Sequence, residues 1–404
     1  MKKSLFAIAA VTAFAGAAQA QSSVTVYGIL DVGYVGANQR AAAPNATAVK
    51  GTSSSFQSSG SESTNRIGFR GTEDLGGGTS AQFVFETNLN TSTATWTPAV
   101  RQGWAGLTQK GMGAVRIGTQ NSLIWQLAAP MTTGQLNNIA GSVVNATAVN
   151  APRAEDNVNA TSGIAFTNRT QRTIQLDSEN IAGIQAKAMY VLNNVNTTQT
   201  TATAPTVGYT GGENNQNGWG LSLDYTGVPK LRVAAAYTAL NADNPYTATQ
   251  AQVNAGTGYA VGTPTPVAGD GFAAGGQNVK DNQMFAAAMY DFGILTAYAN
   301  YVNRKVTSQQ TSNVYAKRSA QEIGVRSFIT PKIEGWASVG NGRYSAYGAS
   351  APTANIFGYQ VGGNYWLSKR TNLYAIYGQV GTTATSANSA LNTNNYAAGV
   401  RHTF

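Results

Sequence analysis

Apolar and polar residues alternate one by one along most of this chain. In the stretch RIGFRGTEDLGG, residues 66–77, Arg66 and Arg70 fall on one side of an extended backbone, and Ile67 and Phe69 fall on the other. An acidic, glycine-rich turn follows directly. Segments of this kind, about ten residues long and separated by turn residues, predict β-strands that are joined as hairpins.

About sixteen such segments can be counted, and the connections between them alternate in length. One set of connections is tight and contains Gly, Pro or Asp, whereas the other set is long and polar. The long connections span residues 37–64, 89–100, 121–168, 193–217, 241–281, 304–318, 344–355 and 381–394. So many long loops would argue against strands in a compact soluble domain. Short turns at one end and long loops at the other are typical of a transmembrane β-barrel.

The alternation therefore predicts an all-β fold: a 16-stranded antiparallel transmembrane β-barrel with short periplasmic turns and long extracellular loops. The apolar face of each strand would meet lipid, and the polar face would meet water in the lumen. This division explains why only 11% of the residues are charged, because Arg or Lys facing the middle of a bilayer costs about 2–4 kcal/mol. Closure also pairs every backbone N–H and C=O group, which a bilayer requires.

Residues 1–20, MKKSLFAIAAVTAFAGAAQA, have a different pattern, with a basic start, an apolar middle and a small-residue ending. This pattern predicts a secretory signal peptide that is cleaved after Ala20, rather than a membrane anchor. Residues 21–404 then form one barrel domain. Without Lys2 and Lys3 that domain has 24 basic residues against 17 acidic ones. The chain has no cysteine, so disulfides cannot stabilise it.

Composition and spacing argue against several other functions. The basic residues are scattered rather than clustered, which argues against nucleic acid as a partner. His402 is the only histidine, so a metal site built from several His or Cys ligands is excluded, and the glycine runs lack the lysine of a phosphate loop. His402 also lies too close to the C-terminus to act as the base of a serine hydrolase at the barrel mouth. We therefore expect no enzyme activity, no cofactor and no metal.

Five blocks of the sequence resemble the trimeric general-diffusion porins of the Gram-negative outer membrane. They are SSVTVYGILDVGY, NRIGFRGTEDLGGG, RQGWAGL, FGYQVGGNYWLSKRTNLYAIYG and the ending AGVRHTF. The resemblance implies a homotrimer in the outer membrane, with the third long loop of each barrel folded inward to narrow the pore. It also implies contacts with outer-membrane lipid and lipopolysaccharide, and with the barrel-assembly machinery. Phe404 matches the terminal aromatic residue of the family's assembly signal.

The resemblance assigns arginines to the wall of the pore constriction. Arg66 and Arg101 match basic-wall positions of the family, and Arg169 matches the wall arginine that opens the sixth strand. Arg116 and Arg70 fall on the inward phase of their own strands. A fixed charge at a constriction sets ion preference, so these five arginines are the candidate basic wall.

Loop three departs from the family's acidic pattern. Residues 121–152 carry no charge, and the only acids of this loop are Glu155 and Asp156. These two acids are candidate counter-charges to the basic wall, although an ordinary salt bridge to Arg153 explains them equally well. The transverse field of the pore is therefore expected to be weak or one-sided.

Two further acids and several aromatic residues have expected places on the barrel. Asp31 and Glu86 face inward by alternation and are candidates to anchor lumen arginines by hydrogen bonds. Aromatic residues near strand ends are expected in the girdle at the membrane interface rather than in the lumen. Those singled out are Trp104, Trp219, Tyr365 and Trp366.

Together these features favour a water-filled outer-membrane channel for passive diffusion of small hydrophilic solutes and ions, with a preference for anions. An alternative of the same fold is a channel that prefers one anionic substrate, such as phosphate or small carboxylates. A remoter alternative is an adhesin or structural barrel in which an inward-folded loop fills the bore.

Overall fold

The computed structural model describes residues 23–42, 49–57, 60–89, 99–145, 169–194, 197–201, 209–212, 215–243, 279–309, 315–347, 353–383 and 390–404. Residues 1–20, predicted as a signal peptide, and the loop-three acids Glu155 and Asp156 lie outside the described residues. Within these ranges, none of the helices has the length and apolar character needed to cross a membrane.

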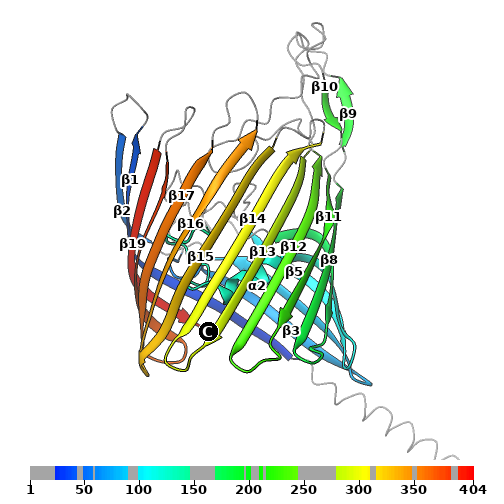
Figure 1. Cartoon of the computed structure of the whole chain (residues 1–404). Helices are drawn as coiled ribbons and strands as arrows, with labels where there is room; N and C mark the ends of the chain where they lie inside the picture. The colour runs from blue at the N-terminus through cyan, green and yellow to red at the C-terminus, as the bar shows by residue number, and fades with distance from the viewer. Residues whose placement is uncertain are drawn as a thin grey trace, which may run out of the picture.

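One antiparallel sheet contains most of the described chain and closes on itself into a barrel (Figure 1). Closure occurs where β1 (Ser23–Ala42) pairs with β19 (Ala390–Thr403). The other strands of this sheet are β2 (Val49–Gln57), β3 (Arg66–Gly76), β4 (Thr79–Asn88), β5 (Val100–Gln109), β6 (Gly113–Asn121), β7 (Arg169–Ser178), β8 (Ile184–Asn194), β11 (Asn215–Tyr225), β12 (Leu231–Asp243), β13 (Val279–Asp291), β14 (Thr296–Ser308), β15 (Tyr315–Thr330), β16 (Ile333–Tyr347), β17 (Ala354–Trp366) and β18 (Thr371–Thr382).

Strands β2 and β3 share a single position in the barrel. Strand β2 pairs with residues 33–41 of β1, and β3 pairs with residues 23–29 of the same strand. With β2 and β3 counted together, the barrel has 16 strand positions, which confirms the predicted fold.

The two faces of the strands have the polarity that the alternation predicted. On β1, Val24 and Val26 are 66% and 51% exposed on the outer surface, whereas Asp31 is fully buried on the inner side. The exposed large apolar side chains of β3 and β4 include Phe69, Phe83 and Phe85. Exposed apolar residues and buried polar ones reverse the pattern of a soluble protein, and they fit a wall with lipid outside.

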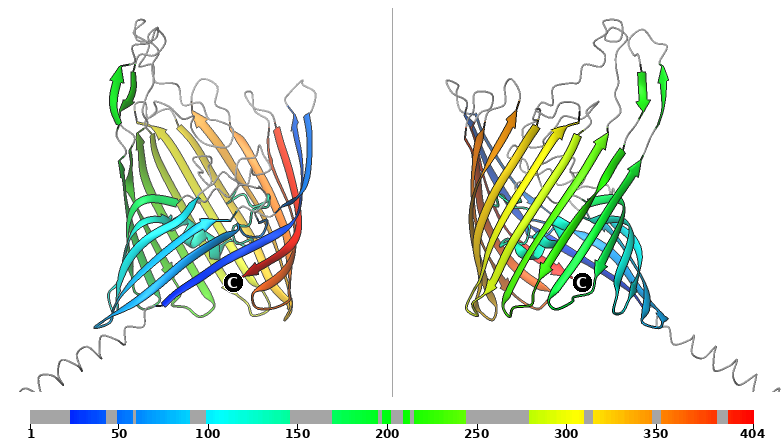
Figure 2. Two further views of the ribbon diagram at one scale, coloured as in Figure 1. Left: turned by 180° about the vertical axis from the view of Figure 1, so that it is seen from behind. Right: turned by 45° about the vertical axis from the view of Figure 1, so that its right-hand side comes forward.

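Short turns connect the strands at the end of the barrel where the C-terminus lies, and the longer connections lie at the opposite end (Figure 2). The turn between β3 and β4 contains Gly76 and Gly77 with φ of +82° and +60°. Glycine is needed there because residues with a side chain rarely adopt positive φ. The predicted turn is therefore confined to the glycines, because Glu73 and Asp74 still belong to β3 and pair with Ala81 and Ser80 of β4.

Several of the connections predicted as loops are partly strand. Residues 37–64 were expected to form one loop, but β1 continues to Ala42 and the chain returns as β2. Likewise, β14 runs to Ser308 and β15 begins at Tyr315, inside the predicted loop 304–318. Polar and charged residues are frequent in these extensions. Above the bilayer the outer face need not be apolar, so the hydrophobic alternation that marks a strand fades before the strand ends. The predicted loop 193–217 also contains a separate hairpin, formed by β9 (Thr197–Thr201) and β10 (Tyr209–Gly212).

The third long connection folds into the barrel, as predicted. After β6 the chain forms helix α2 (Leu123–Met131), whose first turn is capped by Ser122 through a 3.2 Å bond from the Trp125 amide. The apolar side chains of α2 pack against the inner wall, and Val143 and Val144 extend the contact further along the loop. The wall residues of this cluster include Met189, Val191, Ala234, Ala236, Phe285, Ala287 and Val302. The hydrophobic core of the protein therefore lies inside the barrel, between loop three and one side of the wall.

The barrel wall is lower on one side than on the other. Strands β3 to β8 contain 9 to 11 residues each. Strands β12 to β19 contain 12 to 16. The cyan and light-blue strands of Figure 2 show the lower side.

The barrel seam depends on close approach at Gly28. The amide of each of Gly28 and Phe404 donates to the carbonyl of the other at 3.1 Å. A Cβ atom on Gly28 would lie 2.3 Å from the Phe404 ring and 2.6 Å from the Arg66 carbonyl oxygen. We therefore expect Gly28→Val to lower the midpoint of thermal unfolding in detergent micelles. Gly51→Val on β2 is the control, because a Cβ atom there meets nothing within 4 Å. Equal midpoints for the two variants would contradict this account of the seam.

Candidate functional site

Two predicted wall arginines share one carboxylate inside the barrel. Arg101 on β5 donates from Nε to Glu86 Oε1 at 2.7 Å and from Nη1 to Asn88 Oδ1 at 2.9 Å. Arg66 on β3 lies 3.9 Å from the same carboxylate and donates from Nε to the Thr64 carbonyl at 3.0 Å. Two guanidinium groups against one acid leave an excess of positive charge on this wall.

A β-bulge aims Arg101 into the barrel. Glu86 pairs with Gln102 and Thr87 pairs with Val100, so Arg101 is an extra residue opposite the β4 strand. Strict alternation back from the exposed Leu107 would place Arg101 on the lipid face. The bulge turns it inward, because a bulged residue shifts the side-chain phase of its strand.

Tyr27 connects a third predicted arginine to the pair. The Tyr27 hydroxyl donates to Glu86 Oε2 at 3.1 Å, and the Arg70 guanidinium lies over the Tyr27 ring at 5.4 Å from its centroid. Arg66, Arg70, Arg101 and Glu86 thus form one group, which we call the arginine wall.

The other two predicted arginines lie apart from the arginine wall. Arg116 on β6 forms a salt bridge with Asp177 on β7, so an acid of its own offsets its charge. Its guanidinium also lies 5.0 Å from the centroid of the Trp104 ring. Trp104 is therefore on the lumen side, and its expected place in the interfacial girdle is wrong. Arg169 opens β7 opposite Asn121, as the resemblance implied, at the point where loop three leaves the wall.

Asp31 anchors the backbone of an inward segment rather than a lumen arginine. Between β2 and β3, residues 60–65 leave the wall and enter the barrel, and we call them the inward segment. Asp31 Oδ2 accepts hydrogen bonds from the amides of Glu62 and Ser63 at 2.8 and 2.7 Å. Its other oxygen accepts from the Tyr374 hydroxyl at 2.6 Å. Glu86 bonds to an arginine as expected, whereas Asp31 does not, because the inward segment takes up one oxygen of Asp31 and Tyr374 on β18 takes up the other.

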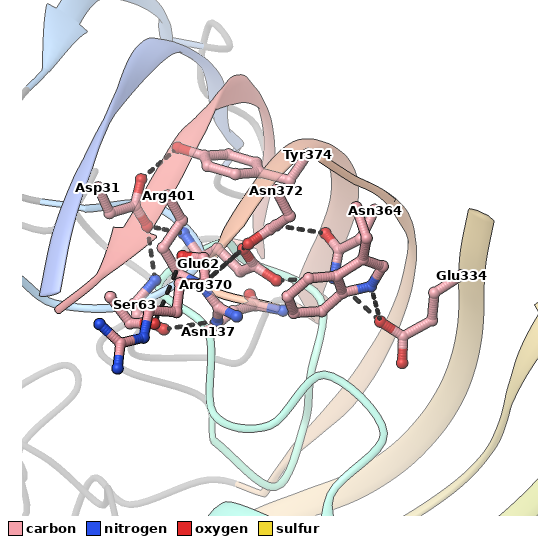
Figure 3. A network of polar contacts seen from close by, with 12 residues as sticks. Asp31, Glu62, Ser63, Asn137, Glu334, Asn364, Arg370, Asn372, Tyr374 and Arg401 are labelled. Carbon is pink, nitrogen blue, oxygen red and sulfur yellow. Dashed lines mark hydrogen bonds and ion pairs between the residues drawn. The ribbon is translucent and has the colours of Figure 1, made fainter. Parts of the chain in front are cut away.

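The inward segment carries a buried acid into a polar cluster on the last strands (Figure 3). Glu62 accepts from Asn364 at 2.9 Å and from Asn372 at 2.8 Å, and its carboxylate lies 3.4 Å from Arg401 Nε. The Arg401 guanidinium in turn lies 5.7 Å from the centroid of the Trp366 ring. Trp366 also faces the lumen, so its expected girdle position is wrong, whereas Trp219 and Tyr365 are exposed on the outer surface as expected.

Sequence reasoning missed Glu62 and Arg401. Glu62 lay within the predicted loop 37–64, and nothing in the loop's composition indicated that it turns inward. Arg401 had a usable signal, because alternation along AGVRHTF places it on the face opposite Val400 and His402.

Arg326 joins loop three to the wall. It forms a salt bridge with Glu334 and donates from Nη1 to the Thr133 carbonyl of loop three at 2.9 Å. Asn137 of the same loop donates to Gln360 Oε1 at 2.6 Å, and the Asn138 side chain donates to the Gly60 carbonyl at 2.8 Å. Loop three is thus bonded both to the wall and to the inward segment.

The described part of loop three adds no charge opposite the arginine wall, since residues 121–145 contain no acidic or basic residue. Within the residues that the structure describes, no group of three or more His, Cys, Asp or Glu side chains could hold a metal ion. The interior of the barrel therefore carries an excess of fixed positive charge at the arginine wall.

Comparison with known proteins gives one family. Residues 7–385 match the family model described as Gram-negative porin. The chain is 37% identical over 132 residues to an outer membrane porin protein of Bordetella pertussis, covering 30% of this chain and 34% of that protein. It is 48% identical over 89 residues to outer membrane porin protein 32 of Delftia acidovorans, covering 22% of this chain and 23% of that protein. The matched regions are therefore about a third and a quarter of those relatives' lengths.

Solved structures share the fold. The structure titled anion-selective porin from Comamonas acidovorans superposes with a TM-score of 0.66 at 19% identity, covering 95% of this chain and 100% of that one. The trimer form of OmpT from Vibrio cholerae superposes with a TM-score of 0.57 at 13% identity, covering 95% and 99% of the two chains.

Glu86 is the residue on which the arginine wall depends. We expect Glu86→Gln to lower the free energy of unfolding by about 3 kcal/mol or more, because Arg101 is then left in a buried position without its carboxylate. Urea unfolding in lipid vesicles, followed by tryptophan fluorescence, measures the change. Glu73→Gln, at an exposed position of β3, is the matched control and should leave stability unchanged. A similar loss of unfolding free energy in both variants would show that the Arg101–Glu86 pair does not contribute specifically to stability.

Proposed function

The chain belongs to the Gram-negative porin family, and on that premise we propose that it forms a water-filled channel for the passive diffusion of small hydrophilic solutes and ions, with a preference for anions. Its place is the outer membrane, and the family and fold are those of channels rather than enzymes. The observation that carries the anion preference is the arginine wall, where Arg66 and Arg101 share the single carboxylate of Glu86.

Electrostatics supports the proposal in two further ways. The described part of loop three is uncharged, so the field of the arginine wall meets no opposing acid there. Low-dielectric walls concentrate that field in the lumen and raise the local concentration of anions. The Comamonas neighbour is titled an anion-selective porin, which agrees with the same preference. Inorganic phosphate and small carboxylates are suitable passengers, and a channel that favours one of them is the alternative.

We expect single channels, in a membrane that separates a concentrated from a dilute KCl solution, to show a reversal potential of anion-selective sign. Arg66→Glu combined with Arg101→Glu should move the reversal potential toward cation selectivity, because the wall charge changes sign. Lys332→Glu combined with Lys369→Glu is the control, since it makes the same charge change in the exposed short turns. If the wall variant leaves the reversal potential unchanged, these arginines do not line the constriction. A wild-type barrel without conductance would favour the plugged alternative.

The proposed assembly is a homotrimer of chains that have lost residues 1–20. The lower side of the barrel, β3 to β8, is the proposed contact surface, because short strands with exposed apolar side chains such as Leu107 and Ile117 suit a neighbouring barrel better than a full bilayer. The Vibrio cholerae neighbour is described in a trimer form. Outer-membrane lipid, lipopolysaccharide and the barrel-assembly machinery are further proposed partners, and Phe404 is the proposed assembly signal.

Native mass spectrometry of the protein extracted from outer membranes tests processing and assembly together. We expect a subunit mass corresponding to residues 21–404 and an assembly of three such subunits. A subunit that retains residues 1–20 would contradict cleavage after Ala20. A monomeric assembly in mild detergent would contradict the trimer without affecting the conductance result.

A further inference from the structure

Four glycines form a line across the inner wall of the barrel, one on each of four neighbouring strands. They are Gly324 on β15, Gly340 on β16, Gly358 on β17 and Gly378 on β18, and we call them the glycine seat. Each lies two positions from a buried residue of its own strand, which places it on the inward face. These buried residues are Glu322, Ser338, Gln360 and Ile376.

Strand register makes the line continuous. Gly340 is directly opposite Gly358, and residues opposite one another in an antiparallel pair have Cα atoms about 4.5–5.5 Å apart. Gly324 is opposite Ser338 and therefore diagonal to Gly340. Gly378 is opposite Gln360 and therefore diagonal to Gly358. Diagonal neighbours are about 7–8 Å apart, so the glycine seat is a strip of backbone without side chains.

Loop three lies directly on this strip, through residues 133–143, which we call the seated segment. A Cβ atom on Gly378 would be 1.8 Å from the Ala140 carbonyl oxygen. A Cβ atom on Gly358 would be 2.4 Å from the Gly141 carbonyl oxygen. The backbone of the seated segment therefore occupies the space that side chains of β17 and β18 would need.

Side chains of the seated segment occupy the same space at the other two glycines. A Cβ atom on Gly340 would be 2.3 Å from Val143 Cγ2, and one on Gly324 would be 2.2 Å from Thr133 Oγ1. All four positions of the glycine seat are thus closed to a methyl group by loop three.

Hydrogen bonds hold the seated segment against the wall. Gln360 Nε2 donates to the carbonyls of Ile139 and Ala140 at 3.1 and 3.2 Å. The Val143 amide donates to Glu322 Oε2 at 3.0 Å. These wall side chains lie beside the glycine seat, and they can reach the loop backbone because the glycines let it approach so closely.

Helix α2 of the same loop meets a different kind of wall. Ala234, Phe285 and Val302 face it, so side chains separate the helix from the sheet. Glycine in the middle of a strand is destabilising relative to alanine, and it often marks a place where another backbone approaches closely. Four glycines in one line therefore indicate that the depth of the seated segment is a constraint on the sequence.

We propose that the glycine seat sets how far loop three extends into the lumen, and thereby the largest solute that the channel passes. Contacts of a Cβ atom shorter than 3.0 Å are not tolerated, so a methyl group on Gly378 would displace the Ala140 carbonyl by about 1.2 Å from its 1.8 Å position. A segment that lies on the wall can move only inward, which narrows the passage beside the arginine wall. This inference rests on the proposed function, because it concerns the width of the proposed passage.

Gly358→Ala combined with Gly378→Ala tests the glycine seat in the full-length assembled protein. We expect the single-channel conductance in KCl to fall about twofold, because the passage is narrower. Polyethylene glycols of graded size lower the conductance only when they enter the channel, and the largest one that enters should become smaller. The reversal potential should keep its anion-selective sign, because no charge has changed.

Gly363→Ala combined with Gly381→Ala is the matched control on the same two strands. Cβ atoms at these positions meet only wall atoms, at 3.1 Å and 3.4 Å, so conductance and polymer limit should stay at the wild-type values. Single-channel records come only from assembled barrels, so a loss of stability alone does not alter them. If the double seat variant does not assemble, Gly378→Ala alone decides.

Four outcomes would overturn the inference. An unchanged conductance and polymer limit in the seat variant would do so while leaving the proposed function intact. An equal fall in the control would show that any added methyl group on these strands has the same effect. A conductance above the wild-type value would mean that loop three leaves the passage instead of narrowing it. A wild-type protein without conductance would overturn this inference and the proposed function together.

Discussion

Every peptide group that lies in the hydrocarbon layer must find its hydrogen-bond partner within the protein, and the rest of this structure depends on that constraint. The barrel sheet satisfies it by closing β19 onto β1, so that its first and last strands pair with each other. Closure turns one face of every strand toward lipid and the other toward an enclosed space. The alternation of the sequence, the low content of charge and the polar interior all follow from it.

Inside the barrel, part of the wall is apolar and is covered by loop three rather than by lipid. Loop three enters the barrel with an apolar helix and finds an apolar patch on the inner wall of β8 and β12 to β15. The arginine wall of β3 to β5 lies on the other side, and it is held by Glu86 and the Tyr27 ring. On the side of loop three the inward charges are paired, as in Arg304 with Asp281 and Arg326 with Glu334.

The barrel and the inward loop were predictable because they follow from periodicity, turn composition and family motifs spread over the whole chain. Arg66, Arg70 and Arg116 were predictable by phase alone, since their strands are regular at those positions. Arg101 was placed correctly only by its motif, because the bulge between Val100 and Gln102 reverses the phase that alternation would give. Glu62 could not be predicted, because its neighbours are small polar residues that suit a loop or a strand end equally well.

The inward segment ties the two ends of the chain together. Glu62 and Asp31, near the N-terminus, are bonded to Asn372, Tyr374 and Arg401, more than 300 positions later. None of these bonds can form until the last strands are in place, so the buried acids near the start of the chain stay uncompensated throughout synthesis and insertion. Contacts of such long sequence separation form late in folding. The bonds from Asp31 and Glu62 to the last strands are therefore among the last contacts of the barrel to form. A barrel that lacks its final strands would keep both carboxylates in its interior without these partners.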